Sequence, residues 1–432
     1  MYRFSWCCLL MALVGLSSLS YADVPEKDKN ANWPPKSFPI TFWCGPPEPY
    51  ITLEQYRAIA DAGFNLVMPP CEGEATVARN RKILDMAAKT GLKAVISDAR
   101  MPLALANNPA GKKALSDIVS DYRKSTALMG YFLTDEPGAN SFGDLADVVA
   151  ELHRLDPDRM VFINLLPNYA STDLTANPSQ LNSLTYAQYL SRYMEVVKPD
   201  VLSWDHYHFL KNSDRPGFFG NLAAGQRAAR TTLPPTPFWQ IVLSVQHGPY
   251  RPLTENELRF EAMQTLVYGG RGLAYFTYWQ PNDPSFQWSN TIRNRDGSPG
   301  PLYAPVKAVN AEVRALGTWL FDAQVEETFQ SGTVPPDGAP GTQDSFVQVT
   351  GESNLTIGTF RGTKGYIYVL VTNRDYKAGA KGQLTLNTVK HAVEMLDLKT
   401  GKWSTWAAKP SGDTVSGEVI LGPAGAALLR WQ

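Results

Sequence analysis

Apolar and polar positions along residues 38–320 repeat in one order: a short apolar run, a polar loop, and then apolar residues at helical spacing. A short apolar run bounded by turn residues is typical of a buried strand. The pattern predicts eight strands, at residues 38–43, 65–68, 92–96, 130–134, 160–164, 201–204, 238–245 and 273–278.

The segments between these runs carry helix signals. Thr52 with Gln55, and Thr254 with Glu257, have the spacing of residues that cap a helix N-terminus, and Gly63 is a typical helix end. Helices are therefore predicted at residues 53–62, 82–89, 141–155, 186–197, 222–230, 254–268 and 306–320.

Strand and helix alternate without interruption, which predicts an α/β fold of the (β/α)8 TIM barrel type. A doubly wound open sheet is the alternative. It would have fewer strands and usually a glycine-rich first turn, and this sequence lacks such a turn.

The pattern changes after about residue 322. Helical stripes give way to short alternating runs at 345–349, 355–360, 366–372, 383–386, 393–396 and 426–431, with a turn at 399–402. This spacing predicts a small all-β sandwich. We therefore expect a barrel domain at 23–322 and a sandwich domain at 323–432, with a separate carbohydrate-binding module as an alternative role for the second.

The first 22 residues have the features of an export signal. Arg3 precedes an apolar run at 4–16 that is too short to span a bilayer, and Ser20 and Ala22 are small residues before a cleavage site ahead of Asp23. We expect a secreted protein, periplasmic or extracellular, with no membrane anchor once the signal is removed. The net charge of −1 gives no indication of a nucleic-acid partner.

Two cysteines, Cys44 and Cys71, remain in the predicted mature chain, each at the end of a strand. Export permits a disulfide between them, and two free thiols are the alternative. Two cysteines without clustered histidines do not favour a zinc site.

The strand at 130–134 is followed by two adjacent acids, Asp135 and Glu136, and then by Pro137. Acids at the end of a buried strand are costly unless they meet water, a ligand or a partner. In a barrel of parallel strands, the carboxyl ends form the active face. Glu136 is therefore the first candidate for a catalytic residue, and a structural ion pair is its alternative role.

The barrel resembles the (β/α)8 glycoside hydrolases of the clan that includes β-galactosidases, β-glucanases and cellulases. The resemblance is carried by the 131–137 strand with its terminal acid, the capped helix at 254–270 with its paired glycines, and the last strand at 272–279. A β-sandwich behind the barrel is also common in these enzymes. The resemblance implies cleavage of a poly- or oligosaccharide, with Glu136 as the general acid.

The second carboxylate that glycoside hydrolysis requires is not evident. In the clan, a glutamate nucleophile ends the seventh strand, but here that strand ends in Gln246 and His247. Three hypotheses remain: Asp205 is the partner of Glu136; Asp135 and Glu136 together perform substrate-assisted hydrolysis of an N-acetylated sugar; or the barrel binds glycan without cleaving it. Glu72 and Asp98 are further candidates for the partner, and Asp135 could instead pair with Arg100.

Aromatic and amide side chains at strand ends are candidates for sugar binding, because aromatic faces stack on pyranose rings. The predicted substrate-binding residues are Trp43, Asn164, Tyr207, Gln246 and Trp279. The resemblance implies that Trp279 forms the floor of the substrate site. Tyr250, Phe286 and Trp288 are further rings in the loops, and packing under loops is the alternative role for each.

His206, His208 and His247 could suggest a metal site. In an extended segment, however, Asp205 faces away from His206 and His208, and the first strand lacks the paired histidines with which barrel metallohydrolases usually begin. We predict no metal and no cofactor.

Overall fold

The computed structural model describes residues 32–174, 180–389 and 391–432. The predicted signal peptide, residues 1–22, lies outside these described residues. Eight parallel strands form one sheet in the order β1-β8-β7-β6-β5-β4-β3-β2, and contacts between β1 and β2 bring its two edges together. The strands are β1 (Ile40–Phe42), β2 (Leu66–Val67), β3 (Lys93–Ile96), β4 (Leu128–Asp135), β5 (Met160–Leu165), β6 (Leu202–Asp205), β7 (Phe238–Leu243) and β8 (Leu273–Phe276). The predicted barrel is confirmed.

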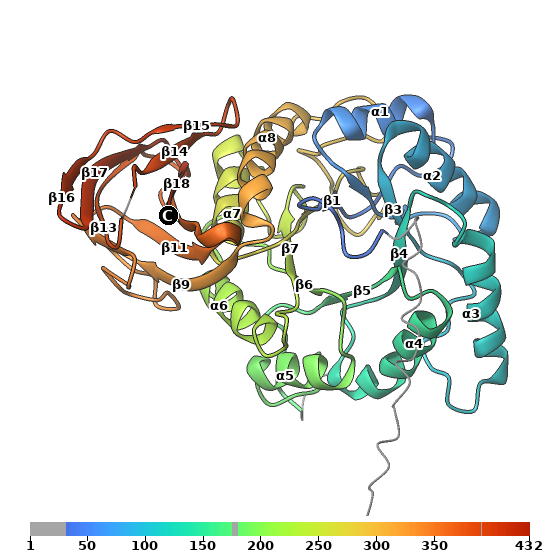
Figure 1. Cartoon of the computed structure of the whole chain (residues 1–432). Helices are drawn as coiled ribbons and strands as arrows, with labels where there is room; N and C mark the ends of the chain where they lie inside the picture. Colours follow the sequence, from blue (N-terminus) through green and yellow to red (C-terminus); the bar gives the residue numbers. More distant parts are fainter. Residues whose placement is uncertain (1–31, 175–179, 390) are drawn as a thin grey trace, which may run out of the picture.

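Eight α-helices formed by the described residues surround these strands (Figure 1). They are α1 (Leu53–Asp61), α2 (Val77–Thr90), α3 (Pro109–Tyr122), α4 (Phe142–Leu155), α5 (Tyr186–Val196), α6 (Phe218–Ala229), α7 (Glu255–Val267) and α8 (Tyr303–Leu320). Helix α3 was missed in the sequence, although Asn108 caps it and Pro109 occupies its first turn. The asparagine cap and the proline in the first turn obscured the apolar stripe that follows.

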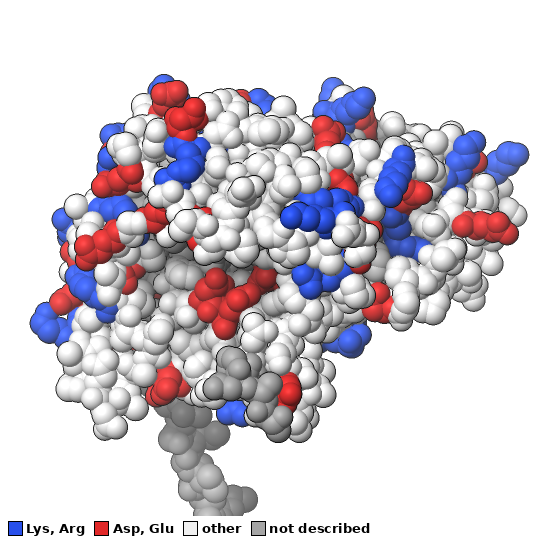
Figure 2. All heavy atoms as spheres, turned by 180° about the vertical axis from the view of Figure 1, so that it is seen from behind, with Lys and Arg blue, Asp and Glu red and all other residues white. Residues whose placement is uncertain are grey.

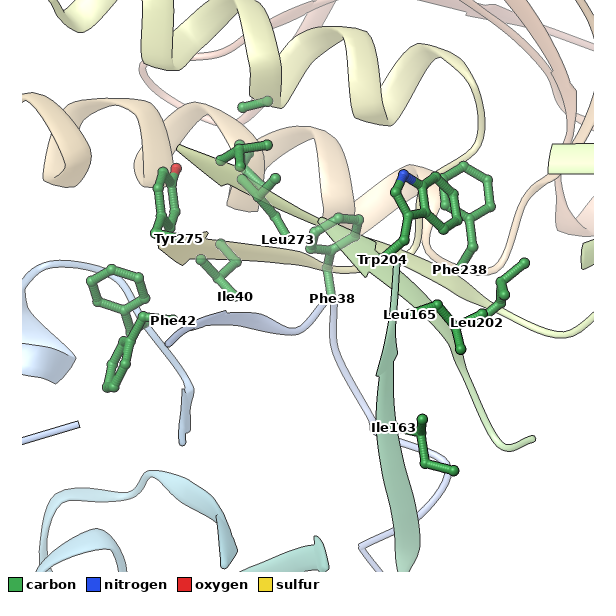
Figure 3. Packing of buried hydrophobic residues seen from close by; sticks show 14 of the residues in the cluster. Phe38, Ile40, Phe42, Ile163, Leu165, Leu202, Trp204, Phe238, Leu273 and Tyr275 are labelled. Carbon is green, nitrogen blue, oxygen red and sulfur yellow. The ribbon is translucent and has the colours of Figure 1, made fainter. Parts of the chain in front are cut away.

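Apolar side chains on the outer face of the strands pack against the helices. Figure 3 shows Trp204 of β6 and Phe238 of β7 side by side, and their rings stack with centroids 5.2 Å apart. A Cβ atom on Gly225 of α6 would lie 2.0 Å from the Trp204 ring, so only glycine lets this helix approach. Burial of these large rings contributes to barrel stability.

The C-terminal part of the chain forms two antiparallel sheets, of order β10-β13-β17-β16 and β15-β14-β18-β12-β11-β9. The predicted β domain is confirmed, but four strands were missed. Polar and charged residues dominate β9, β15 and β16, and Ser416, Gly417 and Glu418 interrupt the apolar residues of β17. The strands are β9 (Gln324–Gln330), β10 (Val347–Thr350), β11 (Leu355–Arg361), β12 (Ile367–Asn373), β13 (Ala380–Leu386), β14 (Glu394–Asp397), β15 (Lys402–Thr405), β16 (Lys409–Ser411), β17 (Thr414–Leu421) and β18 (Ala426–Trp431).

Helix α7 joins the two parts of the molecule. It packs on β7 of the barrel on one side and on β11 and β12 of the sandwich on the other, in the position that Figure 1 shows. The apolar residues Leu258, Ala262 and Leu266 are therefore only part of its buried surface, because Glu261 and Gln264 are also fully buried.

A disulfide joins Cys44, after β1, to Cys71, after β2. Of the two alternatives for these cysteines, the structure has the bridge. Gly45 allows this close approach, since a Cβ atom there would lie 2.4 Å from the carbonyl oxygen of Met68. Within the described ranges, no helix combines the length and the apolar character needed to cross a membrane.

Candidate active site

Asp135 and Glu136 lie at the carboxyl end of β4, and both keep exposed surface. Glu136 has φ of +47°, a left-handed conformation that a non-glycine residue adopts only when its surroundings hold it there. Two contacts hold this turn: the Glu136 N–H donates to the carbonyl of Asn164 (2.8 Å), and the Tyr189 hydroxyl donates to the carbonyl of Pro137 (2.7 Å). The turn breaks the strand alternation, so both neighbouring acids can face one space.

Asn164, at the end of β5, connects two of the acids. Its Nδ2 group donates to Asp135 Oδ1 (3.0 Å) and to Asp205 Oδ1 (3.1 Å). The Ser203 hydroxyl donates to Asn164 Oδ1 (3.1 Å), which fixes the orientation of the amide. Three adjacent strands, β4, β5 and β6, thus place Asp135 and Asp205 around one side chain.

Asp205 is 3% exposed and forms a hydrogen bond with Glu136. Burial, followed by the negative charges of Glu136 and Asp135, raises the pKa of Asp205 well above its ordinary value. Burial also raises the pKa of Glu136, while the hydrogen bond from Asp205 partly offsets this rise. Because the pKa values of both carboxyls are raised and the two groups are in contact, Asp205 and Glu136 can hold one proton between them.

The pKa of Asp135 is raised to about 6, mainly because surrounding protein removes water from a carboxyl that still reaches the solvent. The hydrogen bond from Asn164 opposes this rise, and the charge of Glu136 adds to it. The suggested pairing of Asp135 with Arg100 is wrong, because Arg100 bonds to Asp98 and Asp121. Figure 2 shows acidic side chains gathered in a hollow on the face opposite to that of Figure 1.

The predicted role of Asp205 as the carboxylate across the sugar does not fit this geometry. Glycosidases place their two carboxyls about 5–9.5 Å apart, with the sugar between them. Asp205 instead lies in hydrogen-bond contact with Glu136, which is closer than this spacing. Two other candidates are also engaged: Glu72 forms an ion pair with Arg295, and Asp98 forms one with Arg100. Asp135 is left as the second acid of the cluster with exposed surface.

Two of the predicted sugar-binding residues need correction. Trp279 is only 2% exposed and packs against Tyr50, with ring centroids 4.8 Å apart, so it offers no face to a sugar. Asn164 is 3% exposed, and its amide is used by the acids and by Ser203. Asn164 therefore positions carboxyls, and its contact with a ligand stays a prediction.

The other predicted rings and amides lie on the active face of the barrel. Tyr207 is half-buried, with its ring 5.1 Å from that of Phe276, and Trp43 is half-buried, with its ring 5.4 Å from that of Phe132. Gln246 is also half-buried, and its Oε1 accepts a hydrogen bond from Ser289. These three residues remain candidates for sugar binding.

Some residues of the site were missed in the sequence. Phe276 ends β8 with part of its ring exposed, and Ser203 and Tyr189 support the acids through hydrogen bonds. The aromatic end of β8 was a usable signal for Phe276. No local pattern marks Ser203 or Tyr189, because their role depends on how three strands and a helix come together.

The histidines are dispersed among aromatic rings. His206 is fully buried beside Tyr169, and the ring of His247 stacks on Trp288 with centroids 4.5 Å apart. His208 Nδ1 lies 3.0 Å from the carbonyl of Arg215. Among the described residues, no group of three or more histidine, cysteine, aspartate or glutamate side chains is arranged to bind a metal ion.

No family model matches the chain, and no curated protein matches it. Solved structures do share its fold. A glycoside hydrolase family 5 protein from Bacteroides vulgatus has 12% identity and a TM-score of 0.56, with 91% of this chain and 89% of that chain covered. A β-galactosidase from Bacillus circulans sp. alkalophilus has 10% identity and a TM-score of 0.58, with 92% and 99% covered.

A third structure, of a family 42 β-galactosidase from G. stearothermophilus, has 9% identity and a TM-score of 0.58, with 91% of this chain and 98% of that chain covered. At such identities the likeness concerns the fold alone. The fold is therefore that of (β/α)8 glycoside hydrolases with an additional β domain, which confirms the resemblance found in the sequence.

Proposed function

We propose that this protein is a glycoside hydrolase in which Glu136 donates a proton to the leaving oxygen of a glycosidic bond. One observation carries the proposal: Asp135, Glu136 and Asp205 gather at the active face of a barrel that glycoside hydrolases share, and burial raises the pKa of all three carboxyls. Such a cluster is unfavourable for stability, and perturbed carboxyls of this kind are typical of catalytic sites.

The carboxyls have different roles in this proposal. Glu136 and Asp205 share a proton, which burial retains toward neutral pH, and Glu136 delivers it because it is the member with exposed surface. Asp135 is ionised above pH of about 6. It stabilises the positive charge that develops on the sugar and orients the attacking group, which is water or the acetamido group of an N-acetylated substrate.

Export is part of the proposal. The predicted signal peptide would deliver the protein to the periplasm or beyond, and a poly- or oligosaccharide substrate is found there. The Cys44–Cys71 disulfide supports this location, since such bridges persist in oxidising compartments.

The test compares the wild-type protein with Glu136→Gln on a panel of 4-nitrophenyl glycosides, oligosaccharides and N-acetylated analogues. We expect Glu136→Gln to lose about 10²–10⁴-fold in kcat/KM on oligosaccharides, the usual contribution of general acid catalysis. The loss should be smaller for 4-nitrophenyl glycosides, because 4-nitrophenolate leaves with little need for a proton. Glu352→Gln, an exposed acid in the sandwich domain, is the matched control.

A glycan-binding barrel without catalysis is the second candidate, and Gln246 at the end of β7 favours it. This candidate predicts that the wild-type protein retains an oligosaccharide unchanged and that Glu136→Gln binds it as well as the wild type does. Hydrolysis that disappears with Glu136→Gln would exclude it. If Glu136→Gln instead loses the same factor in kcat/KM for substrates with good and poor leaving groups, Glu136 is not the proton donor.

A further inference from the structure

A pocket of about 220 Å³ opens at the carboxyl ends of β1 to β4. This volume would hold roughly seven waters or one substituted six-membered ring. Besides the Cys44–Cys71 disulfide, its lining consists of Trp43, Met68, Pro69, Pro70, Ser97 and Phe132.

The pocket and the carboxyl cluster share strand β4, which carries Phe132 and ends at Asp135. Tyr131 of β4 pairs with Ile96 of β3, so Phe132 and Ser97 are at one level of the barrel. Asp135 follows Phe132 by three residues on the same strand, a rise of about 10 Å. A ligand whose sugar reaches the acids can therefore place a substituent in the pocket.

The walls of the pocket offer few polar groups. Pro69 and Pro70 have no N–H, and the carbonyls of Trp43, Cys44 and Pro69 already accept backbone hydrogen bonds. The Ser97 hydroxyl accepts from Arg79, and the Ser97 carbonyl accepts from Asn80. A sugar ring here would lose hydrogen bonds to water with little replacement, whereas an apolar group would gain by burial.

The shape of the pocket favours an aromatic group. The Trp43 and Phe132 rings stand at 82° to each other with centroids 5.4 Å apart, so they form two perpendicular walls. A third ring in the corner beside these two rings can make edge-to-face contacts, and the sulfur atoms of Met68 and the disulfide are polarizable partners for it.

We propose that this pocket binds an aryl group attached to the sugar, so that the natural ligands are aryl glycosides or glycans with aromatic substituents. This proposal extends the proposed function by naming a class of ligand. It rests on the proposed function in one respect, because a single ligand is taken to occupy both the pocket and the carboxyl cluster.

The test uses phenyl and methyl 1-thio-glycosides of glucose, galactose and N-acetylglucosamine, since the sulfur linkage resists hydrolysis. Isothermal titration should show a phenyl compound binding about tenfold more tightly than its methyl counterpart for at least one sugar, because of the apolar area that the ring buries. Phe132→Trp, which fills the pocket, should abolish this preference, and Phe132→Leu, which removes one aromatic wall, should reduce it.

Trp43→Phe alters the wall formed by the other ring. It provides a second test of the pocket if a Phe132 variant fails to fold. Phe346→Leu, in the sandwich domain, is the matched control and should retain the full preference. Failure of every phenyl compound to bind, equal binding of phenyl and methyl compounds, or a preference that survives both Phe132→Trp and Trp43→Phe would each overturn the assignment.

The two proposals fail separately. A phenyl preference in a protein that cleaves no O-glycoside would overturn the proposed hydrolase and leave the pocket assignment in place. Hydrolysis of O-glycosides without any phenyl preference would overturn the pocket assignment alone.

Discussion

Strands β3 and β4 are neighbours in the barrel, and an acid follows each of them, but the two acids have opposite surroundings. Asp98, after β3, has a side chain that is 1% exposed and receives hydrogen bonds from Arg100 and Tyr122. Burial alone would raise the pKa of Asp98, but these hydrogen bonds hold it below its ordinary value.

At the end of β4, no paired cation among the described residues offsets the rise in pKa that burial causes. The groups that act on the pKa values of Asp135, Glu136 and Asp205 are one another and the amide of Asn164, together with one backbone N–H. All three pKa values are raised. The comparison shows that an acid at a strand end does not by itself mark a reactive group. A paired cation makes it a structural group, and the lack of one leaves a proton available near neutral pH.

The largest effect on stability is expected from substitution of Asp98, the acid that pairs with Arg100. Asp98→Asn leaves the Arg100 guanidinium without its buried partner, so the free energy of unfolding should fall by about 3 kcal/mol, the lower end of the range for a broken buried pair. Arg100 itself is partly exposed, which limits the loss. Urea unfolding at pH 7 measures the change. An unfolding free energy equal to that of the wild type would show that Asp98 is not held in the way we describe.

A substitution in the carboxyl cluster, where no cation of the described ranges pairs with the acids, should change the free energy of unfolding in the opposite direction. Asn is isosteric with protonated aspartic acid, so Asp205→Asn can keep the hydrogen bonds to Glu136 and Asn164 while removing the tendency to ionise. We expect the free energy of unfolding at pH 7 to rise by about 1 kcal/mol, as is common when a functional site is relaxed. The same variant should move the alkaline limb of the kcat/KM profile to lower pH, because Glu136 no longer shares a proton. Destabilisation would contradict this account of the pair.

The contributions of Asp135 and Asp98 to the stability of the protein should also depend on pH with opposite signs. Asp135 has a pKa of about 6 in the folded protein and about 3.9 when unfolded. The folded state therefore takes up the proton first, and this contribution to stability increases as pH falls from 7 to 4. Asp98 has a lowered pKa, so its contribution is lost as pH falls below about 4.

Thermal melts between pH 7 and pH 5 test the first of these signs. Because Asp135 is open to solvent, the gain should be about 1 kcal/mol or less. Asp135→Asn should remove this gain, whereas Asp98→Asn should leave it unchanged. An Asp135→Asn protein with the pH dependence of the wild type would mean that Asp135 is not the group that titrates.

The fold could be predicted because each strand and helix carries its own periodic pattern. The eight apolar runs gave every barrel strand, and alternation gave most of the sandwich. Helix α3 was missed where prolines precede its stripe, and β17 was missed because Ser416, Gly417 and Glu418 interrupt its apolar residues. These errors are local and do not change the architecture.

The site was less predictable because it depends on contacts between strands. The sequence identified Asp135, Glu136 and Asp205, but no pattern shows that Glu136 takes a left-handed turn and meets Asp205. Trp279 was assigned by resemblance, and the cover provided by Tyr50 could be seen only in three dimensions. The pairing of Glu72 with Arg295 likewise joins residues 223 positions apart.

The smallest effect is expected at Glu72, which tests whether pairing removes a rim acid from catalysis. Glu72 holds the loop after β8 through Arg295 (2.7 Å) and through the N–H of Asn282 (2.9 Å). Both partners of the ion pair are partly exposed, so Glu72→Gln should lower the free energy of unfolding by less than about 1 kcal/mol. If Glu72 only positions this loop, kcat/KM should stay within an order of magnitude of the wild type, and the shape of its pH profile should not change. A loss of kcat/KM as large as that of Glu136→Gln would instead make Glu72 the second catalytic carboxylate. Pairing with a cation would then no longer distinguish structural from catalytic acids at this face of the barrel.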